Sequence, residues 1–540
     1  MNSERLSPDF ATAPQIQPAD MLAIAAQGFR AVICNRPDGE DAGQLPAADI
    51  AAAATSAGLA FAHIPISSRD VAAEDARKMA EALAGLPKPV LAYCRTGARS
   101  ALLWRAAGAI QAPAGGTAPA GGTAKPPATH VHDVVIVGGG SAGIATAASL
   151  LKRNPALDIA IIEPAETHYY QPGWTLVGAG VFRPETTSRP MAHVMPLGVQ
   201  WVRQAATGFA PRENQVILAG GGLLTYRALV VATGIKLDWD AIPGLPESLG
   251  QYGVTSNYRY DLAPYTNKLA GELKAGRAIF TQPPMPIKCA GAPQKAMYLS
   301  CSRWLKTGNL KNIAVEFDLA GAVLFGVSAY VPALMQYIQR YNIALNFETK
   351  LVKVDGPARV ASFERKTPDG TEMIEREFDM LHAVPPQIAP DCVRTSPLAA
   401  ASGYAAVNEA TLQHPDYPNV FALGDACSAS NAKTAAAARQ QAPVVAVNVL
   451  AHLAGKPPQA AYAGYGSCPL TVEYGRIVLA EFGYGGKLMP TFPTWLLDGT
   501  KPTRAAWFLK DRLLPPIYWH GMLKGREWLA RPKAFTPAES

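Results

Sequence analysis

The stretch that most constrains the fold is Asp133-Val-Val-Ile-Val-Gly-Gly-Gly-Ser-Ala-Gly143, an apolar run that breaks into glycines and restarts as a helical pattern. Its glycines have the spacing G-x-G-x-x-G, which turns a strand tightly into a helix whose first N–H groups face a pyrophosphate. A second apolar run ends at Glu163, where a dinucleotide fold places a carboxylate on a ribose hydroxyl. We therefore expect a bound dinucleotide, held by Gly138, Gly140, Ser141, Ala142, Gly143 and Glu163.

Two further strand-and-glycine elements, Leu229–Gly234 and Asn419–Asp425, indicate which dinucleotide is bound. Repeated returns of the chain to one cofactor suit a long molecule such as FAD better than NAD. The added contacts are expected from Thr233, Gly234, Gly424 and Asp425, with Asp425 near the ribityl or pyrophosphate region. The predicted fold class is α/β, a Rossmann-like flavoprotein with two dinucleotide-binding domains, preceded by a further α/β domain.

Composition excludes several other classes of protein. The formal charge of +7 on 540 residues is modest and clusters only near the C-terminus, so no nucleic-acid partner is expected. Seven scattered cysteines do not form a secreted disulfide framework, and without a C-x-x-C pair no metal site is predicted. The first residues lack a secretory signal pattern. We expect a reducing, cytoplasm-facing location.

Residues 1–110 are expected to form the first domain, with buried parallel strands at Ala31–Cys34, Ala60–Ile66 and Pro89–Tyr93 and helices at Pro46–Ala57 and Val71–Leu83. After the last strand, Cys94 precedes a helix beginning near Ala101, with Arg95 and Arg99 close by. A cysteine facing free N–H groups and arginines is expected to be a stabilised thiolate. Cys34, in the middle of a strand, is expected to be a core residue.

The Cys94 loop matches the C-R-x-G-x-R pattern of rhodanese-type sulfurtransferases, and the domain resembles small phosphatase-like domains fused to sulfur-oxidising enzymes. Tyrosine phosphatases require C-x5-R, but Ser100 stands at that position and Arg99 falls one residue short. Three readings stay open: a sulfur carrier, a phosphatase, or a domain without catalytic activity. A Pro, Ala, Gly and Thr tract at 111–130 is predicted to be a flexible linker to an oxidoreductase domain at 131–486.

A segment in the middle of the chain argues against a nicotinamide site. The expected strand Arg277–Phe280 is followed by a loop with four prolines, which cannot supply the backbone donors that a second pyrophosphate needs. The loop offers Cys289 instead. A second thiol, Cys427, follows Asp425 and precedes a helix that includes Lys433 to Leu450, whose N-terminus is expected to lower the thiol pKa. Lys433 is predicted to help stabilise a reduced flavin.

Several motifs resemble sulfide:quinone oxidoreductases of the mitochondrial type over roughly residues 131–532: His168–Gly180, Lys288–Lys295, Lys433–Ala437 and Ser467-Cys-Pro-Leu470. The resemblance implies a redox pair of Cys289 and Cys427 and a non-covalent FAD. It gives no role to Cys301, Cys392 and Cys468, which are expected to be packing residues.

The last segment, 487–540, carries nine Lys or Arg and three Asp or Glu between Lys487 and Lys533, with four of the chain's nine tryptophans. Basic aromatic segments of this kind lie in the membrane interface, although a lid packed on the core is the alternative. We expect a peripheral, monotopic protein on the cytoplasmic side of a membrane. Candidate residues for the path of a quinone are Phe482, Tyr484, Tyr518 and Trp519.

The predicted function is oxidation of sulfide to protein-bound sulfane sulfur at the cysteine pair, with two electrons passed through FAD to membrane quinone. Hydrosulfide attack is expected to leave the persulfide on Cys289. A small thiol or sulfite would accept the sulfur, or the first domain would relay it. The alternatives are a type II NADH:quinone oxidoreductase and a membrane-docked flavin sensor without turnover.

Overall fold

The computed structural model describes residues 4–7, 9–41, 43–66, 73–97, 99–101, 103–104, 107 and 130–535. Most of the predicted linker, 111–129, therefore lies outside the described residues. The chain separates into two compact units, with the boundary between Ala128 and Thr129. Each unit is built around its own sheets.

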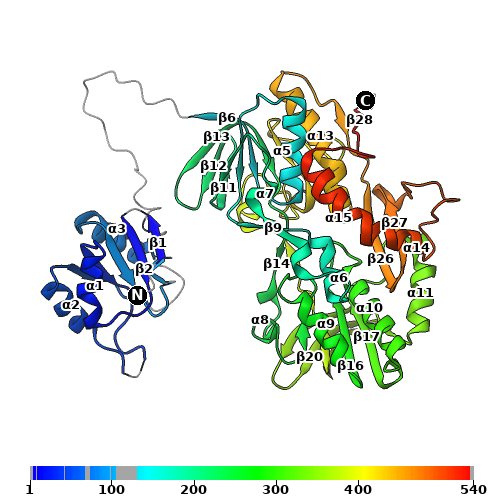
Figure 1. The fold of residues 1–540 in the computed structure, drawn as a ribbon, viewed down its shortest axis with the longest axis horizontal. Helices are drawn as coiled ribbons and strands as arrows, with labels where there is room; N and C mark the ends of the chain where they lie inside the picture. The colour runs from blue at the N-terminus through cyan, green and yellow to red at the C-terminus, as the bar shows by residue number, and fades with distance from the viewer. Residues whose placement is uncertain are drawn as a thin grey trace. The chain divides into compact units, whose positions relative to one another are not determined.

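The first unit is a five-stranded sheet in the order β1-β2-β5-β3-β4 (Figure 1). In that order the strands are Glu4–Ser7, Phe10–Ala13, Val90–Tyr93, Ala31–Cys34 and Ala60–His63. β1 is antiparallel to β2 and the other pairs are parallel. The predicted strands Ala31–Cys34 and Pro89–Tyr93 are confirmed to within one residue. The predicted buried strand Ala60–Ile66 is shorter, ending at His63, and is only partly buried. β1 and β2 were not predicted.

Apolar side chains cover both faces of this sheet. One face packs against Met21 and Ile24 of α1 (Met21–Ala26) and Ile50 of α2 (Ala47–Ser56). The other face packs against Met79 of α3 (Ala73–Gly85) and against Leu103. Alternate residues of a strand point to opposite faces, so a strand buried on both faces reads as a continuous apolar run. This explains why β3 and β5 could be recognised from the sequence.

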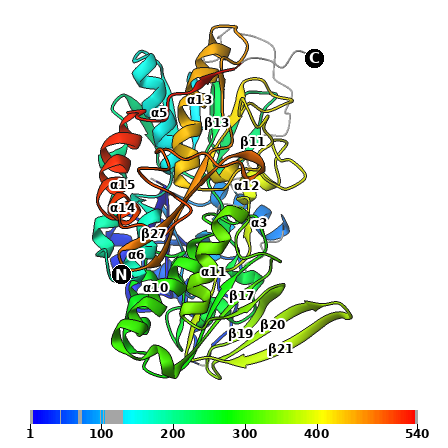
Figure 2. The same cartoon turned by 90° about the vertical axis from the view of Figure 1, so that its right-hand side faces the viewer.

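The second unit begins with a mixed sheet in the order β10-β7-β6-β13-β12-β11, with β24 also paired to β13. In that order, with β24 last, the strands are Val199–Val202, Ile159–Ile162, Val131–Val137, Leu223–Val231, Gln215–Leu218, Ala206–Ala210 and Val420–Ala422. β7, β6, β13 and β24 run parallel, so their carboxyl ends meet at one edge of the sheet. Helices α5 (Ser141–Arg153) and α13 (Ala435–Leu453) pack together on one face (Figures 1 and 2).

A second, parallel sheet has the order β15-β22-β16-β17-β18, with strands Val254–Thr255, Met380–His382, Gly276–Gln282, Ile313–Leu319 and Ala344–Asn346. Its apolar core includes residues of α10 (Ala292–Thr307) and α11 (Val331–Arg340), and α9 (Ala263–Glu272) contacts α10. The antiparallel strands β19 (Thr349–Asp355), β20 (Val360–Thr367) and β21 (Gly370–Glu377) form a separate three-stranded sheet. One mostly parallel mixed sheet and one fully parallel sheet, each packed against helices, confirm the predicted α/β fold class.

Short elements complete the second unit: β8 (Thr167–Tyr169), β9 (Ser188–Pro190), α6 (Trp174–Gly178), α7 (Met191–Val194), β14 (Lys236–Leu237), α8 (Leu245–Ser248), β23 (Gln387–Ile388), α12 (Asp391–Arg394), β25 (Ala460–Ala461) and β28 (Lys533–Ala534). The uncharged run from Leu319 to Met335 contains the last residue of β17 and the start of α11.

The C-terminal part consists of the hairpin β26 (Gly466–Glu473) and β27 (Arg476–Phe482), followed by a string of short helices. These include α14 (Arg504–Phe508) and α15 (Leu514–Pro516), with π-helical turns at Leu509–Leu513 and Ile517–Gly521. α14 packs on β27, as Figure 1 shows. Across the residues that the structure describes, each helix is too short or too polar to cross a bilayer.

Candidate active site

The glycine-rich loop between β6 and α5 opens on a cavity of about 520 Å³. A Cβ atom on Gly138, which has a φ of +108°, would lie 2.3 Å from the carbonyl oxygen of Ala232, so a side chain there would collide with the backbone that follows β13. A Cβ on Gly143 would lie 1.9 Å from the Gly138 carbonyl. Both glycines are therefore required by close packing, and the start of α5 is free to face the cavity.

Most of the predicted cofactor residues line this one cavity: Gly138, Gly140, Ser141, Ala142, Glu163, Thr233, Gly234, Gly424, Asp425 and Lys433. Gly143 packs beneath the loop and is not part of the lining. Four parallel strands, β6, β7, β13 and β24, deliver nearly all of these residues because their carboxyl ends share an edge. The clustering follows the general rule that ligands of α/β sheets bind at this edge.

Glu163, at the end of β7, accepts a hydrogen bond of 2.8 Å from the backbone N–H of Gly139 through Oε2. Its other oxygen, Oε1, accepts one of 2.8 Å from the N–H of Ala165. The two bonds fix the carboxylate beside the glycine loop. A carboxylate in this place can accept a hydrogen bond from a ribose hydroxyl.

The far side of the cavity is formed by the loop after β24. Gly424 has a φ of +68° and donates its N–H to Gln441 Oε1 at 2.7 Å. Burial raises the pKa of the Asp425 carboxyl, although the charges of Lys433 and Lys288 act in the opposite direction. Lys433 Nζ donates to the carbonyl oxygens of Asp425 at 3.0 Å and Cys427 at 2.8 Å. The lysine therefore holds this loop against the cavity.

The lining also fits a polar ligand. Four of its side chains carry buried polar atoms that have no hydrogen-bond partner among the described residues: Trp174 Nε1, Thr175 Oγ1, Thr233 Oγ1 and both amide atoms of Asn257. Buried polar groups are normally paired, so a run of unpaired ones points to a missing partner. FAD suits this cavity because the glycine loop can bind its pyrophosphate and Glu163 can bind its ribose. The unpaired polar side chains in the rest of the lining can then bond its remaining polar atoms.

A pair of thiols lies at the end of the cavity. Cys289 is in the loop between β16 and α10, and its Sγ is 4.0 Å from the Sγ of Cys468 on β26. Cys289 has a φ of +47°, an unfavourable value for a residue with a side chain, and such strain clusters at functional sites. Its N–H donates to the Lys433 carbonyl at 2.8 Å, and Tyr258 Oη donates to its carbonyl at 3.2 Å. The strained turn is thus held from both sides.

Gly291 explains how the two elements approach so closely. A Cβ atom there would lie 2.3 Å from Leu470 Cδ2 and 2.6 Å from Cys468 Sγ. Any side chain would push the start of α10 away from β26. The glycine therefore sets the separation of the two sulfur atoms.

The pKa values of the two thiols are shifted in opposite directions. The pKa of Cys289 is held well below its usual range by the hydrogen bond with Cys468, and by the positive charge of Lys295, against the effect of burial. Lys295 Nζ donates to Cys289 Sγ at 3.1 Å. The pKa of Cys468 is raised well above its usual range by its neighbouring thiolate and by burial. One thiolate and one thiol result.

Lys510, from the π-helical turn after α14, also belongs to this site. Its side chain is buried, and burial together with the charge of Lys295 lowers its pKa to about 7. Nζ donates to the Pro172 carbonyl at 3.4 Å. The C-terminal segment therefore contributes a buried amine near the sulfur pair in addition to covering the cavity.

The structure corrects the expected pairing of Cys289 with Cys427. Among the described residues, the sulfur beside Cys289 is that of Cys468, which was expected only to pack. Cys427 is fully buried, and its Sγ donates to the Gly424 carbonyl at 3.3 Å. Its pKa is raised by burial and not lowered by a helix, because α13 begins at Ala435 and not directly after the thiol. Cys301 is buried and Cys392 half-buried, in apolar surroundings.

The four aromatic residues proposed for a quinone path lie in different places. Tyr518 lines the cavity, and its hydroxyl forms hydrogen bonds of 2.6 Å with Ser141 Oγ and His168 Nε2. Trp519 is buried with Arg189 stacked over its ring. Phe482 packs edge-on against Phe325, and the Tyr484 hydroxyl donates to the Glu409 carbonyl. The apolar lining near Tyr518 comes instead from Phe492, Leu509, Leu514 and Ile517.

The first unit has a separate thiol site at the end of β5. Burial opposes ionisation of Cys94, but the backbone N–H groups of Ser100, Thr96 and Arg99 outweigh it and the pKa is lowered. The N–H of Gly97 donates to its Sγ at 3.1 Å. Arg95, in contrast, is exposed and faces Asp41 at 3.5 Å.

Arg99 is already paired, with Glu40 at 2.7 Å and with the Ile66 carbonyl at 2.8 Å. Cys34, as expected, is a core residue, and burial raises its pKa. The loop therefore stabilises a single negative charge on sulfur. The Glu40 carboxylate, which is paired with Arg99, would repel a doubly charged phosphate and so disfavours phosphate binding at this loop.

Comparison with known proteins agrees with this division of the chain. Residues 3–111 match the family model "Beta-lactamase hydrolase-like protein, phosphatase-like domain", and residues 132–270 match "Pyridine nucleotide-disulphide oxidoreductase". A beta-lactamase hydrolase-like protein of Agrobacterium fabrum is 34% identical over 104 residues, which cover 19% of this chain and 24% of that protein.

The larger part of the chain has longer relatives. The mitochondrial sulfide:quinone oxidoreductase of Dictyostelium discoideum is 41% identical over 76% of this chain and 90% of its own length, and that of Mus musculus is 38% identical over 73% and 87%. The crystal structure of the sulfide:quinone oxidoreductase from Aquifex aeolicus superposes with a TM-score of 0.61 at 20% identity, covering 73% of this chain and 92% of that one. The chain therefore belongs to the sulfide:quinone oxidoreductase family, and FAD is its cofactor.

Proposed function

We propose that this sulfide:quinone oxidoreductase oxidises sulfide at the pair Cys289 and Cys468. The observation that supports this most directly is the placement of the two sulfur atoms, 4.0 Å apart, with Lys295 Nζ 3.1 Å from Cys289 at the end of the cofactor cavity. The present geometry is that of two reduced thiols, because a disulfide requires about 2.05 Å between sulfur atoms. A small approach of the Cys289 turn toward β26 would bring the sulfur atoms within bonding distance, and removal of two electrons and the remaining thiol proton would then form the disulfide.

The asymmetry of the pair indicates which sulfur is attacked. Hydrosulfide attacks Cys468 Sγ of the disulfide, forming a new S–S bond, while the bond between the cysteines breaks and Cys289 leaves as a thiolate. A sulfur with a lower pKa is the better leaving group. Lys295 stabilises the negative charge that develops on Cys289. The persulfide is thus proposed on Cys468, and not on Cys289 as the sequence suggested.

Transfer of the outer sulfur to a small thiol or to sulfite returns Cys468 as a thiolate. The disulfide then forms again, and this releases two electrons. The glycine loop, Glu163 and Asp425 would hold FAD in the cavity, where the cofactor would supply an acceptor for both electrons and the link to quinone. Cys289 is placed to deliver them because it lines the cavity beside Lys288, whereas the buried Cys468 is not among the lining residues. The Lys510 amine, with a pKa of about 7, can take up or release a proton near the pair.

We propose that quinone reaches the cavity from a membrane surface through the C-terminal segment. Several large apolar side chains of this segment are strongly exposed: Trp495 at 85%, Leu496 at 59%, Phe508 at 56% and Leu529 at 71%. Exposed aromatic and apolar side chains on a basic segment suit the interface of a bilayer. Phe492, Leu509 and Leu514 line the cavity from the same segment, so apolar surface leads from the exposed residues inward. The cytoplasmic face is proposed because the reaction depends on reducible thiols.

We propose that Cys94 of the first unit accepts the sulfane sulfur. Its loop stabilises one negative charge on sulfur, which suits a persulfide. A tethered acceptor has an effective concentration in the millimolar range for a flexible connection. Transfer would form Cys94–S–SH and leave Cys468 as a thiolate, so no further oxidant is needed.

The test is sulfide-dependent quinone reduction in three matched variants, Cys289→Ser, Cys468→Ser and Cys427→Ser, each with its FAD content measured. We expect the first two to lose turnover and to keep FAD, because neither thiol belongs to the glycine cradle. Cys427→Ser should keep both. Full activity in Cys468→Ser would refute the proposed pair. NADH in place of sulfide should give no turnover, and turnover with NADH would favour the NADH:quinone alternative.

A further inference from the structure

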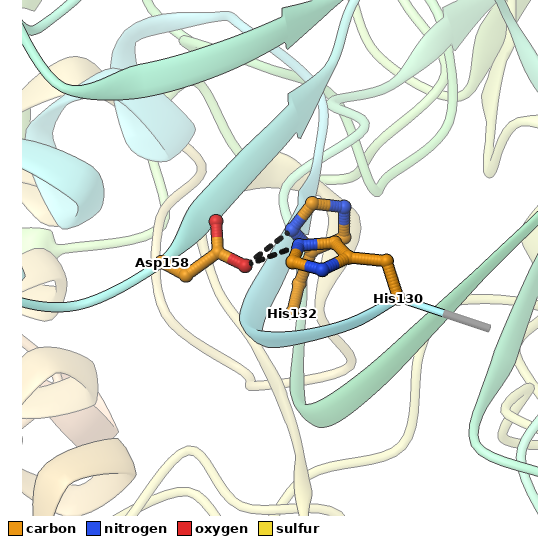
Figure 3. Close-up of side chains that lie close together, drawn as sticks. All are labelled: His130, His132 and Asp158. Carbon is orange, nitrogen blue, oxygen red and sulfur yellow. Dashed lines mark hydrogen bonds and ion pairs between the residues drawn. The ribbon is translucent and has the colours of Figure 1, made fainter. Parts of the chain in front are cut away.

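A cluster of two histidines and one carboxylate lies at the opposite end of β6 from the glycine loop. His130 and His132 flank Val131 at the start of the strand, and Asp158 precedes β7 beside it (Figure 3). Asp158 Oδ2 lies 2.7 Å from His130 Nε2 and 2.9 Å from His132 Nδ1. The potential ligand atoms of all three residues lie within 4.8 Å of one another.

Backbone geometry explains the convergence. Residues two apart in a strand project from the same face, so His130 and His132 are directed to one side at the beginning of β6. β7 pairs in parallel with β6, with Val134 opposite Ile159, which brings Asp158 alongside. The N–H of Asp158 also donates to Asp133 Oδ2 at 3.1 Å, which fixes the backbone that carries the carboxylate.

The structure assigns to His130, His132 and Asp158 a binding site for a divalent transition-metal ion, most suitably Zn²⁺. Two imidazoles and one carboxylate are a ligand set that zinc uses when it keeps an open position for water. Tetrahedral zinc with bonds of about 2.0–2.1 Å separates its ligands by roughly 3.4 Å. The observed separations from the shared oxygen are somewhat shorter, so small side-chain rotations would admit the ion.

The differing exposure of the ligands also suits a metal that enters from solvent. The side chain of His132 is 5% exposed, so packing fixes its orientation before a metal binds. His130 is 71% exposed and Asp158 40% exposed. The neighbouring cation, Arg227, is paired with Asp133 Oδ1 at 2.7 Å, which reduces its repulsion of an incoming metal. No metal site was predicted from the sequence, because Asp158 is 26 positions from His132 and lies beside it only through the pairing of β6 with β7.

The role that fits this position is structural. His130 is eight residues before Gly138, and a strand rises about 3.3 Å per residue, so the ion would lie more than about 20 Å from the cofactor loop. It would not touch the reacting sulfur atoms. It would instead fasten the start of β6 to β7, the two strands whose other ends carry the glycine cradle and Glu163.

The test uses the full-length, FAD-loaded protein carrying Cys94→Ser, Cys289→Ser and Cys468→Ser, so that the reactive thiols do not bind the metal. After treatment with a chelator, Zn²⁺ is titrated by calorimetry and thermal unfolding is followed by circular dichroism. We expect one equivalent to bind and the unfolding temperature to rise. His130→Ala and Asp158→Asn, in the same background, should each weaken binding at least tenfold. His193→Ala, which removes an exposed histidine elsewhere, is the matched control and should bind as the parent does.

Three results would overturn the site. The first is no saturable Zn²⁺ binding near one equivalent, and the second is unchanged Zn²⁺ affinity in His130→Ala. The third is weaker binding in His130→Ala but unchanged affinity in Asp158→Asn, which would remove the carboxylate from the ligand set. His130 is exposed and Asn keeps the shape of Asp, so both variants are expected to fold. Circular dichroism and FAD content verify this before the titration.

Discussion

Replacement of Lys295 by methionine removes the ammonium group nearest to the reactive sulfur and keeps the length of the side chain. Nζ lies 3.1 Å from Cys289 Sγ, and the lysine is 2% exposed, so solvent screens the interaction little. A hydrogen bond to a charged group contributes about 1.5–3 kcal/mol. Its loss corresponds to a roughly 10- to 150-fold smaller thiolate fraction at a pH below the pKa of the thiol.

The sign of the pH dependence follows from the lowered pKa of Cys289. Without Lys295 this pKa rises, so the thiolate forms only at higher pH. We therefore expect the rate of anaerobic enzyme reduction by sulfide, followed by flavin absorbance in a stopped-flow instrument, to fall most at low pH. The deficit should shrink as the pH is raised.

The matched control is Lys306→Met, the same substitution on the exposed face of α10. It should leave both the rate and its pH profile unchanged. Equal pH profiles for Lys295→Met and the parent protein, at equal FAD content, would refute the role given to the lysine. A uniform loss at all pH values would show that the lysine acts by packing and not by charge.

Three further predictions concern other parts of the chain. The pKa of Lys510 is lowered to about 7, so its buried charge destabilises the fold most below that pH, and this destabilisation disappears as the pH rises from 7 toward the ordinary lysine pKa. Lys510→Met should therefore raise the melting temperature more at pH 6 than at pH 9. An equal gain at both pH values would contradict this. The double variant Trp495→Ser and Leu496→Ser should float poorly with liposomes and keep its activity toward a water-soluble quinone, whereas full flotation would make the segment a lid only. After one turnover without an added acceptor, mass spectrometry should find a persulfide on Cys94, and equal acceptor-dependent rates in Cys94→Ala and the parent would exclude a relay.

The cofactor cradle could be predicted because its signals are local. A strand, a glycine turn and a helix are encoded within about a dozen residues around Gly138, and Glu163 follows at a fixed spacing. The same holds for the Cys94 loop, whose thiol and N–H donors are neighbours in the chain. In these cases short-range sequence fixes both the backbone and the side chain that faces the ligand.

The sulfur pair could not be predicted in this way, because it depends on a long-range contact. Cys289 and Cys468 are 179 positions apart and meet only because α10 packs on the hairpin β26–β27, where Gly291 permits a close approach. Cys427 looked more suitable because it follows Asp425 closely, but burial and the later start of α13 remove that advantage. The motif Ser467–Leu470 was the one local sequence signal that could have indicated a functional role for Cys468.

The most direct test of the account is the identity of the disulfide in the oxidised enzyme. The protein is oxidised with quinone, blocked with an alkylating reagent and digested without reduction, and its cross-linked peptides are identified by mass spectrometry. We predict a peptide pair joined through Cys289 and Cys468, either directly or through one additional sulfur atom, with Cys427 recovered as an unpaired thiol. A peptide pair joined through Cys289 and Cys427 would contradict the site described by the structure.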